Sequence, residues 1–269
     1  MGSRKIKLTI QYDGSGYFGW QVQPDKTTIE QLLNQAVTSL IGRKVTVHAA
    51  SRTDAGVSAL GQVGLIEIDS PIPTENFPKA ISDRLPPEIA VIEAVEVDKQ
   101  FDIINDVRCK LYRYTIFNAK PRPVLDTRHC WHIPEKLDIE KMNTAAQLLV
   151  WTKDFKSFAS AKDDRENSTR SIYRCEVRGQ SSNLSFTRKR ESILKSDNLP
   201  QDSNDWIYID VEGNAFLYNM VRNIVGTLVE IGVGRWKPEK MVEIIEAKDR
   251  TAAGRIAPPE GLCLMWIKY

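Results

Sequence analysis

Residues 51–63 read S-R-T-D-A-G-V-S-A-L-G-Q-V, and this short run decides how the chain around it is organised. β-rich segments flank it, so we expect strands at 44–50 and 62–69 with a loop between them. Gly56 and Gly61 can adopt positive φ, which lets the loop turn tightly and bring its backbone close to a ligand. A loop between strands that carries arginine, aspartate and glycine is a frequent place for chemistry. Composition alone favours an ordinary Asp-Gly turn without chemistry.

The segments around this loop predict a compact N-terminal unit. Residues 28–41 have apolar side chains at helical spacing, and Gly42 follows as a stop signal. A second helix is predicted at 74–85, capped by Thr74 and closed by two prolines. With strands at 5–12 and 89–97, the element order is β-α-β-β-α-β, the split unit of ferredoxin-like folds.

The second half repeats this order with longer connections and without clear sequence identity to the first. Strands are predicted at 108–118, 171–177, 206–212 and 262–269, and helices at 137–151, 215–232 and 238–247. We therefore expect an α+β protein in which two ferredoxin-like units join into an extended, mainly antiparallel sheet, with helices on one face and a catalytic cleft between the units. The predicted domains are 1–105 and 106–269, with a flexible, polar insertion around 180–205.

The composition is typical of a soluble protein. Among the 269 residues, 42% are hydrophobic and 27% are charged, and no apolar run approaches the roughly 20 residues of a membrane-spanning helix. The net charge is only +2, so nucleic-acid binding would require basic residues gathered on one face. Four widely spaced cysteines and a start without a signal-peptide core predict a cytoplasmic protein with reduced thiols.

Two suggestive motifs are set aside. Residues 14–19 read G-S-G-Y-F-G, which matches a dinucleotide-binding glycine pattern, but the next predicted helix begins only at Thr28. From the residues alone, the overlapping run at 17–21 reads as a loop whose aromatic side chains are buried. Residues 129–132 read H-C-W-H, and we expect no metal site there because a second cluster of ligands is missing from the sequence.

The helix predicted at 215–232 is apolar on most sides, and Arg222 is its one charge between Glu212 and Glu230. A buried guanidinium requires a hydrogen-bonded anion. From the residues alone, a structural ion pair, an arginine extended to the helix edge and a functional partner for a carboxylate all stay open.

Several of these runs resemble the motifs of the TruA-type tRNA pseudouridine synthases, in the family's order over nearly the whole chain. Residues 51–58 are similar to the family's catalytic loop, G-R-T-D-A-G-V-H, with Ser51 and Ser58 as departures. Further similar runs are Y-F-G-W-Q at 17–21, Y-R-Y at 112–114, D-F-K-S-F at 154–158, F-L-Y-N-M-V-R-N-I-V-G at 216–226 and G-L-C-L at 261–264.

The resemblance implies isomerisation of uridine to pseudouridine at positions 38, 39 and/or 40 in the anticodon stem-loop of tRNA, without a metal or small-molecule cofactor. It implies that Asp54 is the essential carboxylate, that Tyr112 stacks on the target base and that Arg222 pairs with Asp54. Substrate binding is assigned to Arg52, Tyr112, Thr53 and Gly56, and candidate phosphate contacts are Lys162, Arg165, Arg170 and Arg174. The family also implies a homodimer that binds tRNA across both subunits.

Two other functions are compatible with the residues. One is a tRNA-binding module without catalysis, which would bind tRNA and form no product. The other is a nucleoside glycosidase that uses a lone carboxylate and would release free uracil. For the isomerase itself, attack by the aspartate and an aspartate-assisted, glycal-like elimination are both open.

Overall fold

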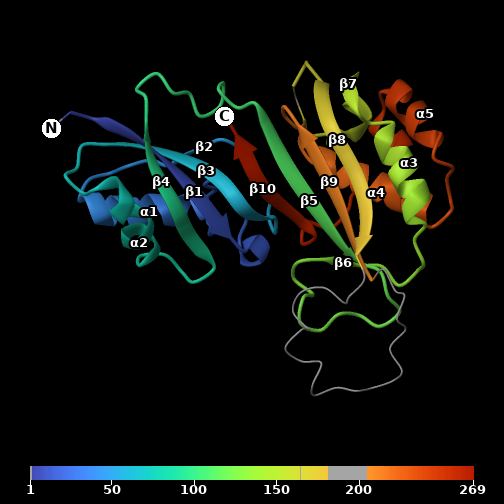
Figure 1. Ribbon diagram of the computed structural model, residues 1–269, viewed down its shortest axis with the longest axis horizontal. Coiled ribbons are helices and arrows are strands. Elements are labelled where there is room, and N and C mark those ends of the chain that lie inside the picture. The colour runs from blue at the N-terminus through green and yellow to red at the C-terminus, as the bar shows by residue number, and fades with distance from the viewer. Residues whose placement is uncertain (1, 164, 181–204) are drawn as a thin grey trace. The chain divides into compact units, whose positions relative to one another are not determined.

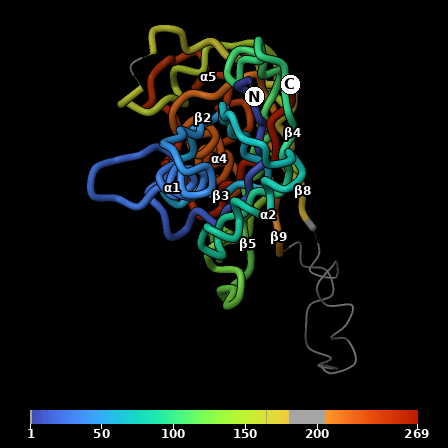
Figure 2. The backbone as a smooth tube through the Cα atoms, turned by 90° about the vertical axis from the view of Figure 1, so that its left-hand side faces the viewer, coloured from blue at the N-terminus to red at the C-terminus, as the bar shows by residue number. Residues whose placement is uncertain are grey.

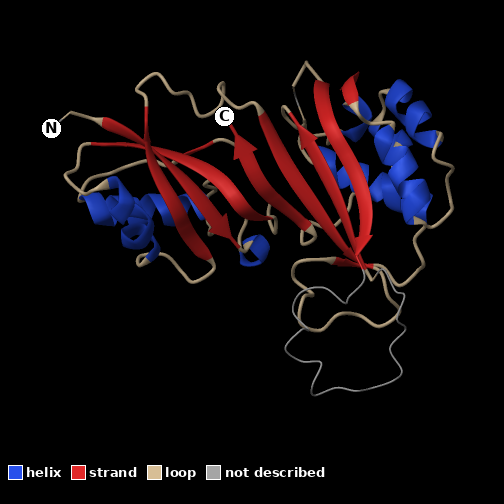
Figure 3. Cartoon of the chain, in the orientation of Figure 1, coloured by secondary structure: helices blue, strands red, loops and turns tan. Residues whose placement is uncertain are grey.

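The computed structural model describes residues 2–163, 165–180 and 205–269. These residues form ten β-strands and five α-helices, and most of the strand pairs are antiparallel (Figure 3). The predicted α+β class is therefore confirmed. The chain divides into two compact units. The first contains 1–112, 212–215 and 262–269, and the second contains 113–211 and 216–261.

The first unit has the predicted β-α-β-β-α-β order. Its elements are β1 (Arg4–Tyr12), α1 (Ile29–Ile41), β2 (His48–Ala49), β3 (Ser58–Ile68), α2 (Phe77–Ser82) and β4 (Ile89–Val97). The strand order is β4-β1-β3, with β2 antiparallel to one part of β3 and β10 (Leu262–Lys268) parallel to another. Helix α1 contacts α2, and α2 contacts β4 (Figure 1; Figure 2). Alternate residues of β1, such as Ile6 and Leu8, are fully buried in the core of this unit.

Two elements of the first unit are shorter than predicted. The strand expected at 44–50 pairs only through His48 and Ala49, because the amides of Val45 and Val47 donate to side chains of α1 instead. The helix expected at 74–85 consists of a 3-10 turn at Thr74–Asn76 followed by α2, and the predicted Thr74 cap is wrong. The Gly42 stop of α1 is confirmed, since Gly42 ends the helix with a φ of 76°, and the structure adds an N-terminal cap in which Thr28 accepts from the backbone amide of Gln31.

Strand β5 (Cys109–Phe117) begins in the first unit and continues into the second. The second unit adds β6 (Trp131–His132), α3 (Ile139–Gln147), β7 (Trp151–Asp154), β8 (Thr169–Gln180), α4 (Met220–Gly232) and α5 (Lys240–Ala247). It also contains β9 (Trp206–Gly213) except for the last two residues, which group with the first unit. Its strand order is β5-β9-β8-β7. Helix α3 contacts both β8 and α4.

Backbone conformation explains two differences in the second unit. The helix expected at 137–151 ends at Gln147, and Trp151 has a φ of 100°, which a right-handed helix excludes; β7 begins there. The helix expected from Ala215 begins only at Met220, because Asn219 has a φ of 61°. Every residue of α4 except Arg222 is buried, as the apolar pattern predicted.

The division into units differs from the predicted boundary after residue 105. Strand β10 and the segment 212–215 group with the first unit, although the sequence assigned them to the second domain. The predicted flexible insertion around 180–205 falls almost entirely on residues 181–204, which lie outside the described residues.

Candidate active site

The loop that carries Asp54 joins β2 to β3 and is hydrogen-bonded on both sides. The Ala50 amide donates to the Val63 carbonyl at 3.0 Å, and the Trp20 amide donates to the Thr53 carbonyl at 3.0 Å. Gln62, which is fully buried, donates through Nε2 to the Ser51 carbonyl at 2.8 Å. These contacts fix the backbone of the loop before any substrate binds.

The glycine run at 14–19 brings one stretch of backbone against this loop. Gly19 has a φ of 83°, and a Cβ built on it would lie 2.6 Å from the Thr53 carbonyl oxygen. A Cβ on Gly14 would lie 2.0 Å from the Val57 carbonyl oxygen. The Gly56 amide donates to the Tyr17 carbonyl at 3.2 Å. Gly14 and Gly19 therefore serve close packing against the Asp54 loop, where no larger residue fits.

Side chains in the loop alternate between the interior and the surface. The Thr53 hydroxyl is buried and hydrogen-bonded to the Tyr12 hydroxyl at 2.7 Å. Its neighbour Arg52 is exposed, and Asp54 is half-buried. Thr53 thus anchors the loop to the interior of the unit, while Arg52 and Asp54 lie toward the surface. Of the residues predicted to contact substrate, Arg52 and Asp54 are accessible, whereas the Thr53 side chain is engaged inside the unit.

Tyr112 lies next to the same loop. Its hydroxyl is 3.1 Å from the Ser51 hydroxyl, and the residue is 7% exposed. Burial raises the pKa of Tyr112 to about 12; the hydrogen bond with Ser51 opposes this rise, and the negative charge of Asp54 adds to it. The first unit therefore brings together Asp54, Ser51 and Tyr112, and the phenol remains protonated at neutral pH.

Lys110 is a neighbour that the sequence interpretation missed. Its Nζ donates to the Ala50 carbonyl at 2.8 Å, immediately before the loop. Burial lowers the pKa of Lys110 to about 8. Lys110 is two residues before Tyr112 on β5, so strand alternation places both on the same face and could have identified it. Gln62 could also have been identified from the sequence, since it is a polar residue within an apolar strand.

Arg222 lies in the second unit, near the start of α4. Its Nε donates to the Ala257 carbonyl at 2.8 Å, and its Nη1 donates to the Asn219 side-chain oxygen at 3.1 Å. In return, the Ala257 amide donates to the Arg222 carbonyl at 3.1 Å. A Cβ on Gly226 would lie 1.6 Å from the Arg255 carbonyl oxygen, so only glycine lets the segment before Ala257 pack on the helix. Asp54 and Arg222 belong to different units, and their pairing stays a prediction.

The predicted phosphate contacts differ in their surroundings. Arg165 binds Asp163 through Nε and Nη2 at 2.8 and 2.5 Å. Arg170 donates through Nη1 to the carbonyls of Asn167 and Thr169. Lys162 is exposed. Arg174 lies 3.7 Å from Glu176 on the surface of β8. Arg165 and Arg170 are engaged by protein groups, and all four phosphate contacts stay predictions.

The H-C-W-H run at 129–132 makes ordinary structural contacts. The Cys130 thiol donates to the Asp126 carbonyl, and His132 Nε2 lies 2.8 Å from the Ala119 carbonyl oxygen. Within the described parts of the chain, no group of three or more histidine, cysteine or acidic residues is arranged to hold a metal ion. In those same parts, no helix has the length and apolarity needed to cross a membrane.

A family model described as tRNA pseudouridine synthase matches residues 8–105 and 145–269. The chain therefore belongs to the tRNA pseudouridine synthase family, of the TruA type. A tRNA pseudouridine synthase A of Caldicellulosiruptor saccharolyticus is 38% identical over 266 residues, which cover 99% of this chain and 100% of that protein. Relatives with the same name from Caldicellulosiruptor bescii and Geotalea uraniireducens are 39% and 38% identical over the same shares.

Proposed function

We propose that this protein isomerises uridine to pseudouridine in the anticodon stem-loop of tRNA, at positions 38, 39 and/or 40, with Asp54 as its essential carboxylate. The reaction breaks the N1–C1′ bond, joins C1′ to C5, releases the C5 proton and leaves a proton on N1. The observation that carries this proposal is the Asp54 loop itself, fixed by Gln62, Trp20 and Ala50 and lying beside Tyr112.

The target uridine must leave the base stack before it reaches Asp54, at a cost of a few kcal/mol. Arg52, exposed two residues before Asp54, is suited to fill the gap in the stack and to hold the adjacent phosphate. Tyr112 stacks on the flipped uracil, a contact worth ~1–3 kcal/mol. Its protonated hydroxyl is suited to assist movement of the C5 proton.

Arg222 is proposed to pair with Asp54 and to keep it ionised, because an adjacent positive charge lowers the pKa of a carboxyl group. The contacts of Arg222 to Asn219 and Ala257 support this role by fixing its guanidinium. Thr53 and Gly56 contribute mainly by supporting the loop backbone beneath the substrate.

The partner is tRNA, and the family resemblance supports a cytoplasmic homodimer that binds one tRNA across both subunits. A matched set of tRNA substrates tests the assigned positions. Each contains one uridine at 38, 39 or 40 and cytidine at the other two sites. Pseudouridine is mapped with wild-type protein and with Asp54→Asn. Product at one or more of these sites, lost in the variant, supports the proposal; product only elsewhere in the tRNA contradicts it. Intact tRNA binding without product would favour the binding module, and free uracil would favour the glycosidase.

A further inference from the structure

Asp163 occupies a buried position in the second unit that the proposed reaction does not use. Its side chain is 3% exposed and accepts four hydrogen bonds. Three come from Arg165, through the backbone amide, Nε and Nη2, and the fourth comes from the Tyr218 amide at 2.7 Å. The Arg165 guanidinium is the main cause that lowers the pKa of Asp163 well below its ordinary value.

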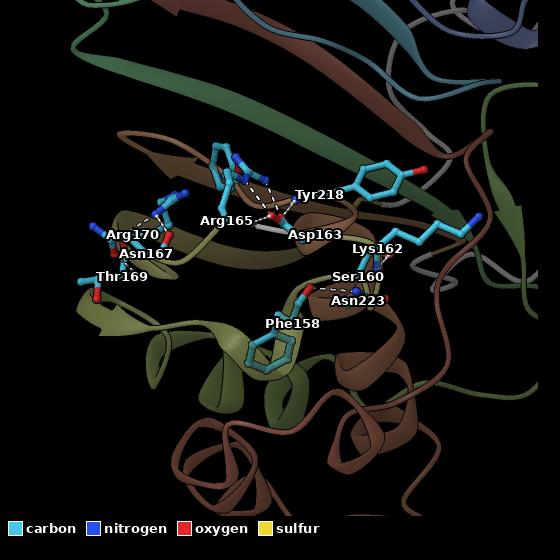
Figure 4. A network of polar contacts seen from close by, with 11 residues as sticks. Phe158, Ser160, Lys162, Asp163, Arg165, Asn167, Thr169, Arg170, Tyr218 and Asn223 are labelled. Carbon is cyan, nitrogen blue, oxygen red and sulfur yellow. Dashed lines mark hydrogen bonds and ion pairs between the residues drawn. The ribbon is translucent and has the colours of Figure 1, made fainter.

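These contacts join two segments that lie far apart in sequence. The Ser160 amide donates to the Tyr218 carbonyl at 2.9 Å, and Arg165 Nη1 donates to the Phe216 carbonyl at 3.2 Å. Figure 4 shows Arg165 and the Tyr218 backbone converging on the Asp163 carboxylate, while the Tyr218 ring points away from it. Asn223 also donates to the Phe158 carbonyl, which ties the first turn of α4 to the same segment (Figure 4).

The segment held in this way leads directly to Arg222. Asn219 follows Tyr218, has the left-handed φ of 61°, and accepts a hydrogen bond from Arg222 Nη1 at 3.1 Å. Asparagine tolerates this conformation better than most residues. A chain of contacts therefore runs from the Asp163 carboxylate through the Tyr218 peptide and the Asn219 side chain to the Arg222 guanidinium.

We propose that Asp163 and Asn219 are positioning residues for Arg222 in the isomerisation, Asn219 by direct contact and Asp163 by fixing the Tyr218–Asn219 backbone. The inference rests on the proposed role of Arg222. An ionised carboxylate suits the Asp163 position because all four of its partners are donors. An asparagine there would turn an N–H₂ group toward another donor.

The test uses the full-length protein and measures kcat and KM for tRNA by tritium release from C5-labelled uridine. Asn219→Gly keeps the left-handed backbone and removes the acceptor, and Asn219→Asp keeps an oxygen in place. Glu230→Gln is the matched control, since Glu230 is a largely buried carboxylate on the same helix that pairs with Arg235 at 2.6 Å. Thermal unfolding midpoints show that each variant is folded.

We expect Asn219→Gly and Asp163→Asn to lower kcat by roughly ten- to a hundred-fold with little change in KM, a loss typical of a misplaced catalytic group. Asn219→Asp restores most of kcat, and Glu230→Gln keeps the wild-type value. In an Arg222→Met background, assayed with enzyme in excess, neither Asn219→Gly nor Asp163→Asn lowers the rate further.

The inference is overturned if Asn219→Gly or Asp163→Asn lowers the rate of Arg222→Met by the same factor as it lowers the rate of the wild type. It is also overturned if these substitutions change only KM. If Asp163→Asn fails to fold, the comparison of Asn219→Gly with Asn219→Asp decides the matter alone. Wild-type turnover by Arg222→Met contradicts the proposed role of Arg222. If Arg222→Met loses most of its turnover while Asn219→Gly keeps the wild-type rate, only the positioning role of Asn219 and Asp163 is rejected.

Discussion

The hydroxyl of Tyr112 lies 3.1 Å from the hydroxyl of Ser51, three residues before Asp54 on the same loop. This contact joins β5 to the Asp54 loop within the first unit, and it orients a phenol that stays protonated at neutral pH. The proposed stacking by the Tyr112 ring and the proposed proton transfer by its hydroxyl can be tested separately.

Tyr112→Phe keeps the ring for stacking and removes the hydroxyl. If the hydroxyl assists proton movement from C5, kcat falls by roughly a hundred-fold while KM stays near wild type, as for loss of a general acid or base. Steady-state kinetics on tRNA measure both values. Ser51→Ala is the control, since it removes only the hydrogen-bond partner. Unchanged rates in Tyr112→Phe would exclude the proton-transfer role.

Gly19 tests whether close packing against the Asp54 loop matters for turnover. Gly19→Ala introduces a Cβ 2.6 Å from the Thr53 carbonyl oxygen, whereas Gly42→Ala has a similar positive φ and open space around it. Both substitutions cost about 1–2 kcal/mol in backbone strain. Only Gly19→Ala should also lower kcat, because it displaces the Asp54 loop. Equal turnover in the two variants would show that this contact is structural only.

Gly226 tests the packing that brings Ala257 to Arg222. A Cβ at Gly226 would lie 1.6 Å from the Arg255 carbonyl oxygen, so the backbone must move. We expect Gly226→Ala to reduce the free energy of unfolding by about 3 kcal/mol, as severe overpacking does. Gly16→Ala is the control, because nothing lies within 4 Å of its Cβ. Urea unfolding that gives the same stability for both variants would contradict the close approach.

Lys110 makes stability depend on pH in a predictable direction. Burial lowers its pKa to about 8 from the ordinary 10.5, so the unfolded chain binds more protons than the folded chain between these values. Stability should therefore rise with pH across this window, by up to about 1.4 kcal/mol per pH unit, and level off below about pH 8, where Lys110 is protonated in both states. Lys110→Met lacks the pH-dependent part of the stability that comes from titration of the Lys110 amine.

The measurement is the difference in unfolding free energy between wild type and Lys110→Met at about pH 7.5 and about pH 10. Other groups titrate equally in both proteins, so the change in this difference isolates Lys110. A difference that stays constant between the two pH values would show that the Lys110 amine keeps an ordinary pKa.

Local sequence patterns predicted most of the elements. Alternating burial in β1, the Gly42 stop of α1 and the apolar character of α4 all follow from short-range chemistry. Errors arose where the backbone departs from a regular element without a Gly or Pro signal. Asn219 and Trp151 have positive φ although neither is glycine, and the sequence gives little warning of this.

The candidate site was only partly predictable. The run around Asp54 was visible as a motif, and strand alternation indicated the shared face of Lys110 and Tyr112. The partners of Asp163 could not be predicted, because Tyr218 lies 55 residues further along the chain and meets it only in the folded unit. Likewise, the late start of the next helix excluded a nucleotide-binding role for the glycines at 14–19, but the close approach of Gly14 and Gly19 to the Asp54 loop could not be predicted.

The most direct test of the central claim is tritium release from tRNA labelled at uridine C5, measured with wild type and Asp54→Asn alongside tRNA binding. Isomerisation at C5 must release this tritium, and the single carboxylate substitution preserves the shape of the loop. We expect release by the wild type and its loss in Asp54→Asn with tRNA binding retained. Release by Asp54→Asn at the wild-type rate would contradict the assignment of Asp54 as the essential residue.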